Sequence, residues 1–246
     1  MDRQPIRVAM WSGPRNISTA MMRAFDNRAD TAVVDEPFYA AFLAGTGLDH
    51  PMRDEVLASQ PADWRAVAAA MVGPVPGGRA VFYQKHMTHH MLPDFGLDWT
   101  GACANAFLIR DPARVLASYV KKRERPTLAD IGVERQAELF NREADRLGHA
   151  PPVIEGVDVL ADPRRALTRL CDAVGIPFSQ SMLAWPAGSR DSDGVWGPAW
   201  YDAVVRSTGF ELARAEEDAP VLDEELRRVA DAARPFYERL AAHALR

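Results

Sequence analysis

Short apolar runs without polar alternation recur along the chain, and each is followed by a segment with helical spacing. The runs lie at residues 6–11, 31–34, 80–83, 104–109 and 152–154. Strands buried on both faces read as continuous apolar runs, so the pattern predicts a parallel sheet between two layers of helices, joined by right-handed crossovers. We therefore expect a three-layer α/β fold with about five central strands.

Apolar residues at three- and four-residue steps predict helices after several of these strands. Met21, Met22 and Phe25 share one face of the first such segment. The last helix is the longest, and it is amphipathic. The expected helices span residues 18–27, 113–122, 163–174 and 222–245.

Composition limits the class of protein. The chain has 246 residues, of which 48% are hydrophobic, and its net charge is −5. This length supports a hydrophobic core, and we expect one domain over residues 1–246. The acidic balance argues against a general nucleic-acid partner, and no apolar run is long enough to predict a membrane span. With no visible signal peptide and with Cys103 and Cys171 far apart, we expect a cytoplasmic protein.

Lysine is scarce in this sequence. The 29 basic residues include only three lysines, namely Lys85, Lys121 and Lys122. A GC-rich coding bias is sufficient to explain the count. Any function that requires a lysine must nevertheless use one of these three.

The loop after the first strand has the composition of an anion-binding site. Residues 12–19 read Ser-Gly-Pro-Arg-Asn-Ile-Ser-Thr and open the first helix. A helix N-terminus offers unpaired N–H groups, Arg15 adds a permanent charge, and Ser18 and Thr19 add hydroxyl donors. The loop lacks the second glycine and the lysine of a Walker A motif. The alternative is a helix capped by Ser18 beside a surface arginine.

The fourth strand leads into a second group of anion-binding side chains. Arg110 stands at the carboxyl end of the strand, which in open α/β sheets faces the ligand crevice. Asp111 is placed to cap the next helix and Pro112 to occupy its first turn. Ser118 lies about two turns into that helix, so Arg110 and Ser118 are placed to hold one anion. The alternative is an ion pair of Arg110 with Asp35 or Glu36.

These segments together resemble the nucleotide-binding signatures of the sulfotransferases, a family within the P-loop nucleoside-triphosphatase-like superfamily. The spacing from Arg110 to Ser118 matches the family's 3′-phosphate motif, and Pro14 to Thr19 resembles its 5′ loop. A third segment, residues 153–163, resembles the family's strand-E-x-L-x-x-D-P stretch. The resemblance covers roughly residues 6–200.

The resemblance implies a donor and the residues that hold it. The donor would be 3′-phosphoadenosine 5′-phosphosulfate, with no metal required. Ile17 replaces a glycine of the family loop, and Arg190 belongs to a late motif that is only partly present. By this resemblance the donor-binding residues are Arg15, Asn16, Ser18, Thr19, Arg110, Ser118 and Arg190.

Two residues compete as the catalytic base of a sulfuryl transfer. His86 falls on the family's catalytic histidine when the sequence is counted back from Leu92-Pro93, and imidazole is a suitable base. Glu36 follows the second strand, and a carboxylate is the base in some relatives. Arg15 is expected to act on the leaving group. The pair His89 and His90 lacks acidic or cysteine partners in register, so no metal site is predicted.

The acceptor is expected to be a small molecule with a hydroxyl or amine. Its pocket would be formed by segments 40–63 and 127–149. The aromatics near the loop at residues 184–198 are placed to stack an adenine, to cover an acceptor, or to join the core; they are Trp185, Trp196, Trp200 and Tyr201. No oligomeric state is indicated.

Three other functions stay open. A magnesium-dependent phosphotransferase or nucleotide hydrolase would use Asp35 as a metal ligand. A non-catalytic nucleotide-binding relative would explain Ile17. A pyridoxal-phosphate enzyme would need Lys85, the one lysine at a strand end.

Overall fold

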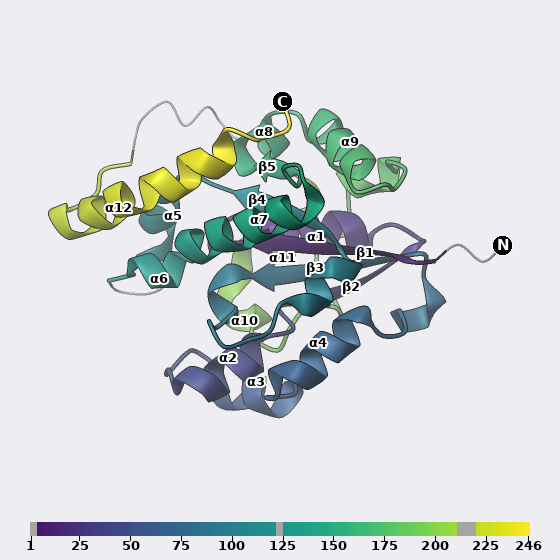
Figure 1. Ribbon diagram of the computed structural model, residues 1–246, viewed down its shortest axis with the longest axis horizontal. Helices are drawn as coiled ribbons and strands as arrows, with labels where there is room; N and C mark the ends of the chain where they lie inside the picture. The colour runs from purple at the N-terminus through teal and green to yellow at the C-terminus, as the bar shows by residue number, and fades with distance from the viewer. Residues whose placement is uncertain (1–3, 122–124, 211–219) are drawn as a thin grey trace.

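A computed structural model gives the fold and describes residues 4–121, 125–210 and 220–246. Five strands form one sheet in the order β2-β3-β1-β4-β5, and every neighbouring pair is parallel. Helices cover both faces, so the predicted three-layer α/β architecture is confirmed (Figure 1). The strands are β1 Ile6–Ser12, β2 Thr31–Asp35, β3 Val81–Met87, β4 Ala104–Ile109 and β5 Val153–Glu155.

The helices in the described parts of the chain follow the strands in sequence. The α-helices are α1 Ser18–Asp26, α2 Tyr39–Thr46, α3 Arg53–Ser59, α4 Trp64–Val72, α5 Pro112–Tyr119, α6 Leu128–Ile131, α7 Val133–Leu147, α8 Gly156–Ala161, α9 Pro163–Ala173, α10 Gly197–Trp200, α11 Asp202–Arg206 and α12 Glu224–Ala241. The 3-10 turns are η1 Pro76–Gly78, η2 Thr88–His90, η3 Asp98–Ala102 and η4 Gln180–Leu183. The predicted C-terminal amphipathic helix is α12, and it is shorter at both ends than expected.

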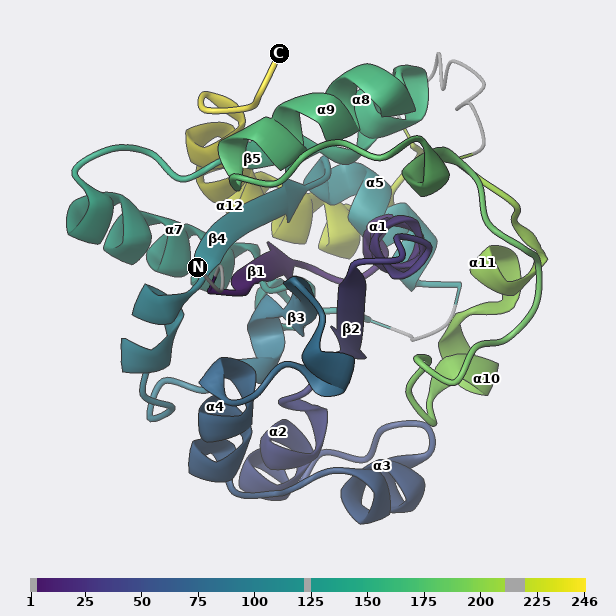
Figure 2. The same cartoon turned by 90° about the vertical axis from the view of Figure 1, so that its right-hand side faces the viewer.

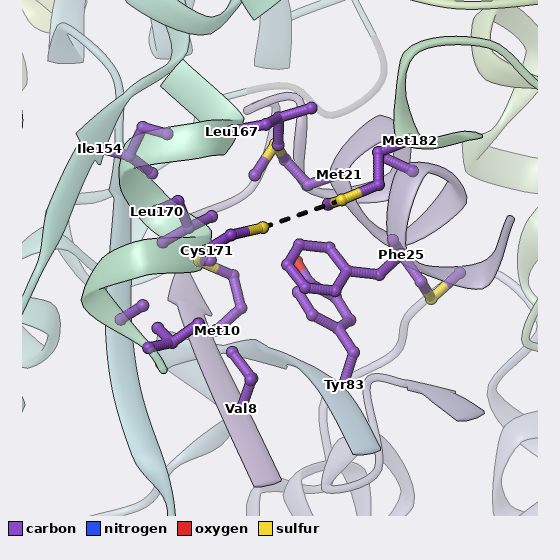
Figure 3. Packing of buried hydrophobic residues seen from close by; sticks show 14 of the residues in the cluster. Val8, Met10, Met21, Phe25, Tyr83, Ile154, Leu167, Leu170, Cys171 and Met182 are labelled. Atoms are coloured by element: carbon purple, nitrogen blue, oxygen red, sulfur yellow. Dashed lines mark hydrogen bonds between the residues drawn. The ribbon is translucent and has the colours of Figure 1, made fainter. Parts of the chain in front are cut away.

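The two faces of the sheet have separate apolar cores. Helices α1, α8 and α9 pack on one face, against Val8, Met10 and Tyr83. Figure 3 shows this core, in which Phe25 of α1 stacks on the Tyr83 ring with centroids 4.1 Å apart. Helices α4, α7 and α12 pack on the other face, and Figure 2 shows α1 and α7 on opposite sides of the sheet.

Strand β3 lies between β1 and β2, and all seven of its residues are buried. Side chains alternate between faces along a strand, so Tyr83, Lys85 and Met87 share the α1 face. Gln84 and His86 point to the opposite face. The sequence predicted this strand only as far as residue 83, and its true end four residues later brings Lys85 and His86 into the sheet.

The segment after α12 returns to the sheet. The Leu245 N–H donates to the Val153 carbonyl at 2.9 Å, and Ala244 forms a parallel bridge with Val153. The outer side of β5 is therefore paired at this point.

No helix in the described ranges is both long and apolar enough to span a bilayer.

Candidate functional site

A cavity of about 800 Å³ opens at the carboxyl ends of strands β1 to β4. Its walls include the loop after β1, the residue after β2, the last residues of β3 and the residue after β4. This is the position at which open α/β sheets bind ligands. Arg15, Glu36, Lys85 and Arg110 represent these four segments in the lining.

One half of the cavity is cationic, and its residues come from two separate parts of the sequence. The Arg15 Nε donates to Ser118 Oγ at 3.1 Å, and Arg110 Nη1 donates to the Arg15 carbonyl at 2.6 Å. Arg15 has a φ of 54°, a left-handed conformation at the tip of the loop. Arg110 is bound to the loop rather than to Asp35 or Glu36. The structure therefore gathers Arg15, Arg110 and Ser118 in one place, and all three line the cavity.

The N-terminus of α1 adds backbone donors to this cationic half. The first intrahelical bond runs from the Met21 N–H to the Ile17 carbonyl, so the N–H groups of Ser18, Thr19 and Ala20 precede the bonded ladder. No side chain of the described residues caps the helix, and Ser18 is its first residue rather than its cap. Ser18, Thr19 and Ala20 all line the cavity. The positive end of the helix dipole is thus available to an anion.

Asn16 and Gly13 fix the shape of the loop. Asn16 lines the cavity with its neighbours, but its amide mainly holds the loop together. It donates to the Leu108 carbonyl at 3.1 Å and accepts from the Ile17 N–H at 2.9 Å. A side chain at Gly13 would come within 2.5 Å of the Ile131 carbonyl, so only glycine fits there.

Ile17 does not occupy a conformation that requires glycine. Its φ is −78°, and its side chain packs against the apolar core beneath α1. The departure from the family loop therefore leaves the backbone of this helix start in an ordinary conformation.

Arg190 lies outside the cavity lining. Its Nη1 pairs with Asp26 Oδ2 at 2.7 Å, and Ser192 donates to the same oxygen at 3.0 Å. These contacts attach the late loop to the C-terminal end of α1. Arg190 is therefore the one donor-binding residue expected by resemblance that the structure does not bring to the others.

The other half of the cavity is lined by Glu36 and Lys85, and Lys85 is shared between Glu36 and Asp35, which lies behind the lining. Lys85 Nζ lies 2.8 Å from Asp35 Oδ1 and 2.5 Å from Glu36 Oε1. The Tyr201 hydroxyl donates to Asp35 Oδ2 at 2.6 Å and accepts from Lys85 at 3.1 Å. The Gly194 N–H also donates to Asp35 Oδ2, at 3.1 Å. Asp35 is thus fully engaged by protein donors, which argues against a metal-binding role.

Burial and charge shift the pKa values of this group. Desolvation and the neighbouring Asp35 raise the pKa of Glu36, and Lys85 acts in the opposite direction. Burial alone would lower the pKa of Lys85, but the two carboxylates raise it above its ordinary value. Burial also raises the pKa of Tyr201 well above the ordinary phenol value, so its hydroxyl stays protonated.

Glu36 has one oxygen directed to the lysine and one without a hydrogen bond to the described residues. Its Oε2 lies 3.9 Å from His90 Nδ1, beyond hydrogen-bond distance. Glu36 lines the cavity and is 9% exposed. A carboxylate with a raised pKa at the edge of a cavity is a suitable proton acceptor.

His86 lies on the opposite face of the sheet and does not line the cavity. Its ring stacks on Trp11 with centroids 4.5 Å apart and lies 5.3 Å from Trp99. Its Nε2 is 3.2 Å from Gln84 Oε1. Burial lowers the pKa of His86 to about 3, with a smaller contribution from Lys85. This geometry is that of a hydrogen-bonded core histidine, and it argues against a role as the base.

Three other histidines surround the acidic half of the cavity. His50, His89 and His90 all line it, and Tyr39 stacks on His90 with centroids 4.4 Å apart. Tyr39 also hydrogen-bonds His50 Nδ1 at 2.9 Å. Burial and the neighbouring cationic groups hold the pKa of His90 well below its ordinary value. In the parts of the chain that the structure describes, no three His, Cys, Asp or Glu side chains are grouped to hold a metal ion.

Sequence reasoning underestimated Lys85 and did not connect Tyr201 to the carboxylates. The sequence placed Lys85 at a strand end, and the face of the strand that it occupies was not considered. Side chains two residues apart on a strand share a face, so a large apolar residue at position 83 could have placed Lys85 on the α1 face. Tyr201 is 166 residues from Asp35, and no local pattern indicates that contact.

A parallel sheet with a loop of unpaired backbone N–H groups between its first strand and helix is an architecture that many nucleotide-binding α/β domains use. The sequence model of the sulfotransferase domain matches residues 6–244. The chain therefore belongs to the sulfotransferase domain family.

Two curated relatives are similar over most of this chain. Branched-chain-amino-acid aminotransferase-like protein 1 of Arabidopsis thaliana is 37% identical over 207 residues, which cover 84% of this chain and 37% of the relative. Branched-chain-amino-acid aminotransferase-like protein 2 of the same plant is 34% identical, covering 81% of this chain and 35% of the relative. The chain thus spans little more than a third of their length.

Solved structures show the same fold. The sulfotransferase domain from the curacin biosynthetic pathway matches with a TM-score of 0.55 and 16% identity, covering 94% of this chain and 98% of that one. The sulfotransferase domain from the Synechococcus PCC 7002 olefin synthase matches with the same TM-score and identity, covering 94% and 96%.

Proposed function

We propose that this protein transfers a sulfuryl group from 3′-phosphoadenosine 5′-phosphosulfate to a hydroxyl or amine of a small-molecule acceptor. One observation carries the proposal. Two arginines, a serine and an open helix N-terminus converge in a cavity that also contains a carboxylate with a raised pKa. Cations at one end and a proton acceptor at the other match the needs of this reaction.

The cationic half suits the two anionic groups of the donor. We assign the 5′-phosphosulfate to Arg15, Asn16, Ser18 and Thr19, since a planar guanidinium, hydroxyls and helix N–H groups all bind such anions. We assign the 3′-phosphate to Arg110 and Ser118, which the Arg15 contacts hold beside the loop. The cavity volume of about 800 Å³ is within the range of nucleotide-sized sites.

Glu36 is the base that the geometry favours over His86. In the transfer, the acceptor oxygen or nitrogen forms a bond to sulfur as the bond from sulfur to the phosphate oxygen breaks. The acceptor proton passes to Glu36, whose Oε2 makes no hydrogen bond with the described residues. Arg15 and the helix N-terminus stabilise the charge that develops on the leaving phosphate.

Two alternatives are less well supported. A magnesium-dependent reaction would need Asp35 as a ligand, but Lys85, Tyr201 and Gly194 occupy its oxygens. An aminotransferase needs a lysine amine free to form an imine, whereas Lys85 is held as a cation between two carboxylates. The relatives named for that activity are proteins of which this chain spans only about a third.

Donor binding tests the proposal. We expect the protein to bind 3′-phosphoadenosine 5′-phosphate with a Kd on the order of micromolar, and Arg110→Ala to weaken it at least about tenfold, because a charge-assisted contact contributes roughly 1.5–3 kcal/mol. Isothermal calorimetry measures both. Arg142→Ala is the matched control, since Arg142 pairs with Asp98 on exposed α7 surface. Absent binding, or equal binding by Arg110→Ala, would contradict the donor assignment.

A further inference from the structure

Two consecutive carboxylates face a single lysine at the end of β2. Successive side chains of an extended strand point to opposite faces, so Asp35 and Glu36 would ordinarily diverge. Glu36 has a φ of 41°, and this left-handed residue breaks the alternation. Both carboxylates therefore reach Lys85, at 2.8 Å and 2.5 Å. With one cation for two anions, the way in which Lys85 is shared decides the charge on Glu36.

Residues 194–201 supply the hydrogen-bond donors that pair with Asp35, the carboxylate that competes with Glu36 for Lys85. Tyr201 lies between α10 and α11, and its hydroxyl donates to Asp35 Oδ2 at 2.6 Å. The same hydroxyl accepts from Lys85 at 3.1 Å and from Trp196 Nε1 at 2.9 Å, so its one proton and both lone pairs are engaged. The Gly194 N–H completes the second oxygen of Asp35. Asp35 consequently depends less on Lys85 for its stabilisation than Glu36 does.

We propose that Asp35 and Tyr201 are positioning residues that set how Lys85 is shared, and thereby control whether Glu36 is an anion that is able to accept the acceptor proton. This inference rests on the proposed function only in taking Glu36 as the base. Tyr201 favours the anion of Glu36 in two ways. It takes up part of the negative charge of Asp35 and holds the lysine, and its hydroxyl also lies 3.5 Å from Glu36 Oε1. Asp35 acts against Glu36, because a second carboxylate competes for the same cation.

Within the ranges that the structure describes, the titratable groups next to Glu36 come from four segments. They are Asp35 from β2, Lys85 from β3, His90 from η2 and Tyr201 from the segment between α10 and α11. His90 is neutral because burial and its neighbours hold its pKa well below the ordinary value. Tyr201 stays protonated. Asp35 and Lys85 are thus the charged neighbours that control Glu36.

Of three variants, one is expected to lower the titration midpoint of Glu36 and two are expected to raise it. Asp35→Asn removes the competing charge, so the Glu36 midpoint should fall by about one pH unit. Lys85→Met removes the cation, so the midpoint should rise by roughly one to three units. Tyr201→Phe deletes one hydroxyl, so the midpoint should rise by less than about one unit.

The titration can be followed without an acceptor. NMR of isotope-labelled glutamate carboxyls reports each midpoint, and the Glu36 resonance is identified by its absence in Glu36→Gln. Tyr83→Phe is the matched control for Tyr201→Phe, because Tyr83 is a buried phenol on the same side of β3 whose hydroxyl has no hydrogen-bond partner among the described residues. It should leave the midpoint unchanged.

The outcomes are distinct. Opposite shifts in Asp35→Asn and Tyr201→Phe support the inference, and these two variants suffice if Lys85→Met does not fold. Shifts in the same direction, or no shift in either, would overturn it. Failure of the wild-type protein to bind 3′-phosphoadenosine 5′-phosphate would contradict the proposed function while leaving the titration result intact.

Discussion

Lys85 and His86 are neighbours on β3 and are equally buried, at 1% exposure, but their pKa values are shifted in opposite directions. Lys85 faces the cavity and lies between Asp35 and Glu36. His86 faces the other core and stacks on Trp11. The two carboxylates raise the pKa of Lys85, whereas burial lowers that of His86 to about 3.

The comparison shows that burial alone does not decide the charge of a basic side chain. Desolvation disfavours the cation at both positions, and only Lys85 has anions close enough to reverse it. A one-residue step along a strand changes the face of the sheet. Here it places Lys85 at the cavity and His86 in the apolar core of the opposite face. The resemblance to the sulfotransferase motif placed the catalytic base at His86. The geometry instead favours Glu36, on the side of the sheet that holds Lys85.

The largest expected effect is on turnover. Glu36→Gln should lower it about 10²- to 10⁴-fold with the affinity for 3′-phosphoadenosine 5′-phosphate nearly unchanged, because the general base is lost and the cationic half is intact. Release of that product, with an acceptor found by screening alcohols, phenols and amines, measures the rate. Glu143→Gln is the control, since Glu143 is a buried carboxylate bonded to Thr100 and Asn105 away from the cavity. Full activity in Glu36→Gln would exclude Glu36 as the base.

His86→Phe should affect stability rather than turnover. Between about pH 6.5 and 3 the unfolded histidine binds a proton that the folded one does not, so the free energy of unfolding falls as the pH decreases and is fully retained above pH 6.5. Each pH unit in this window costs about 1.4 kcal/mol for such a group. The variant should flatten this dependence while keeping the aromatic stack with Trp11. Urea denaturation across the pH range measures it.

The outcome of His86→Phe also bears on catalysis. A turnover of the variant within about twofold of wild type agrees with a packing role for His86. Such a change corresponds to a few tenths of a kcal/mol in the activation free energy. A loss comparable to that of Glu36→Gln would return the catalytic role to His86.

The smallest effect is expected at Tyr83, two residues before Lys85 on the same face. Its buried hydroxyl has no hydrogen-bond partner among the described residues, while its ring stacks on Phe25. Tyr83→Phe keeps the ring and removes an unsatisfied polar group, so it should be neutral or stabilising by up to about 1–2 kcal/mol. Thermal denaturation at fixed pH measures this. A marked destabilisation would show that the hydroxyl has a partner in solution.

Much of the architecture could be predicted from the sequence because it depends on local patterns. Continuous apolar runs indicated the parallel strands, and the Asp111 cap with Pro112 at the start of α5 is present as expected. Arg110 and Ser118 were predicted to hold one anion and Arg15 another, and the contacts of Arg15 bring the three side chains together.

The remaining features depend on side-chain direction and on contacts between distant segments. The face that His86 occupies follows from the alternation of side chains along the strand, and a motif counted along the sequence does not contain this information. An ion pair of Asp35 or Glu36 with Arg110 was left open as an alternative, but their partner is Lys85, because β2 and β3 are adjacent in the sheet. Arg190 was expected at the donor, but its pairing with Asp26 depends on the path of the late loop.

The bridge between Ala244 and Val153 has a consequence for how the molecule behaves at high concentration. β5 is the outermost strand of the sheet and is only three residues long. An unpaired strand at that position would offer its backbone to the sheet of another molecule. The chain segment after α12 pairs with that backbone, so a segment that does not line the cavity protects the sheet against strand addition from this side.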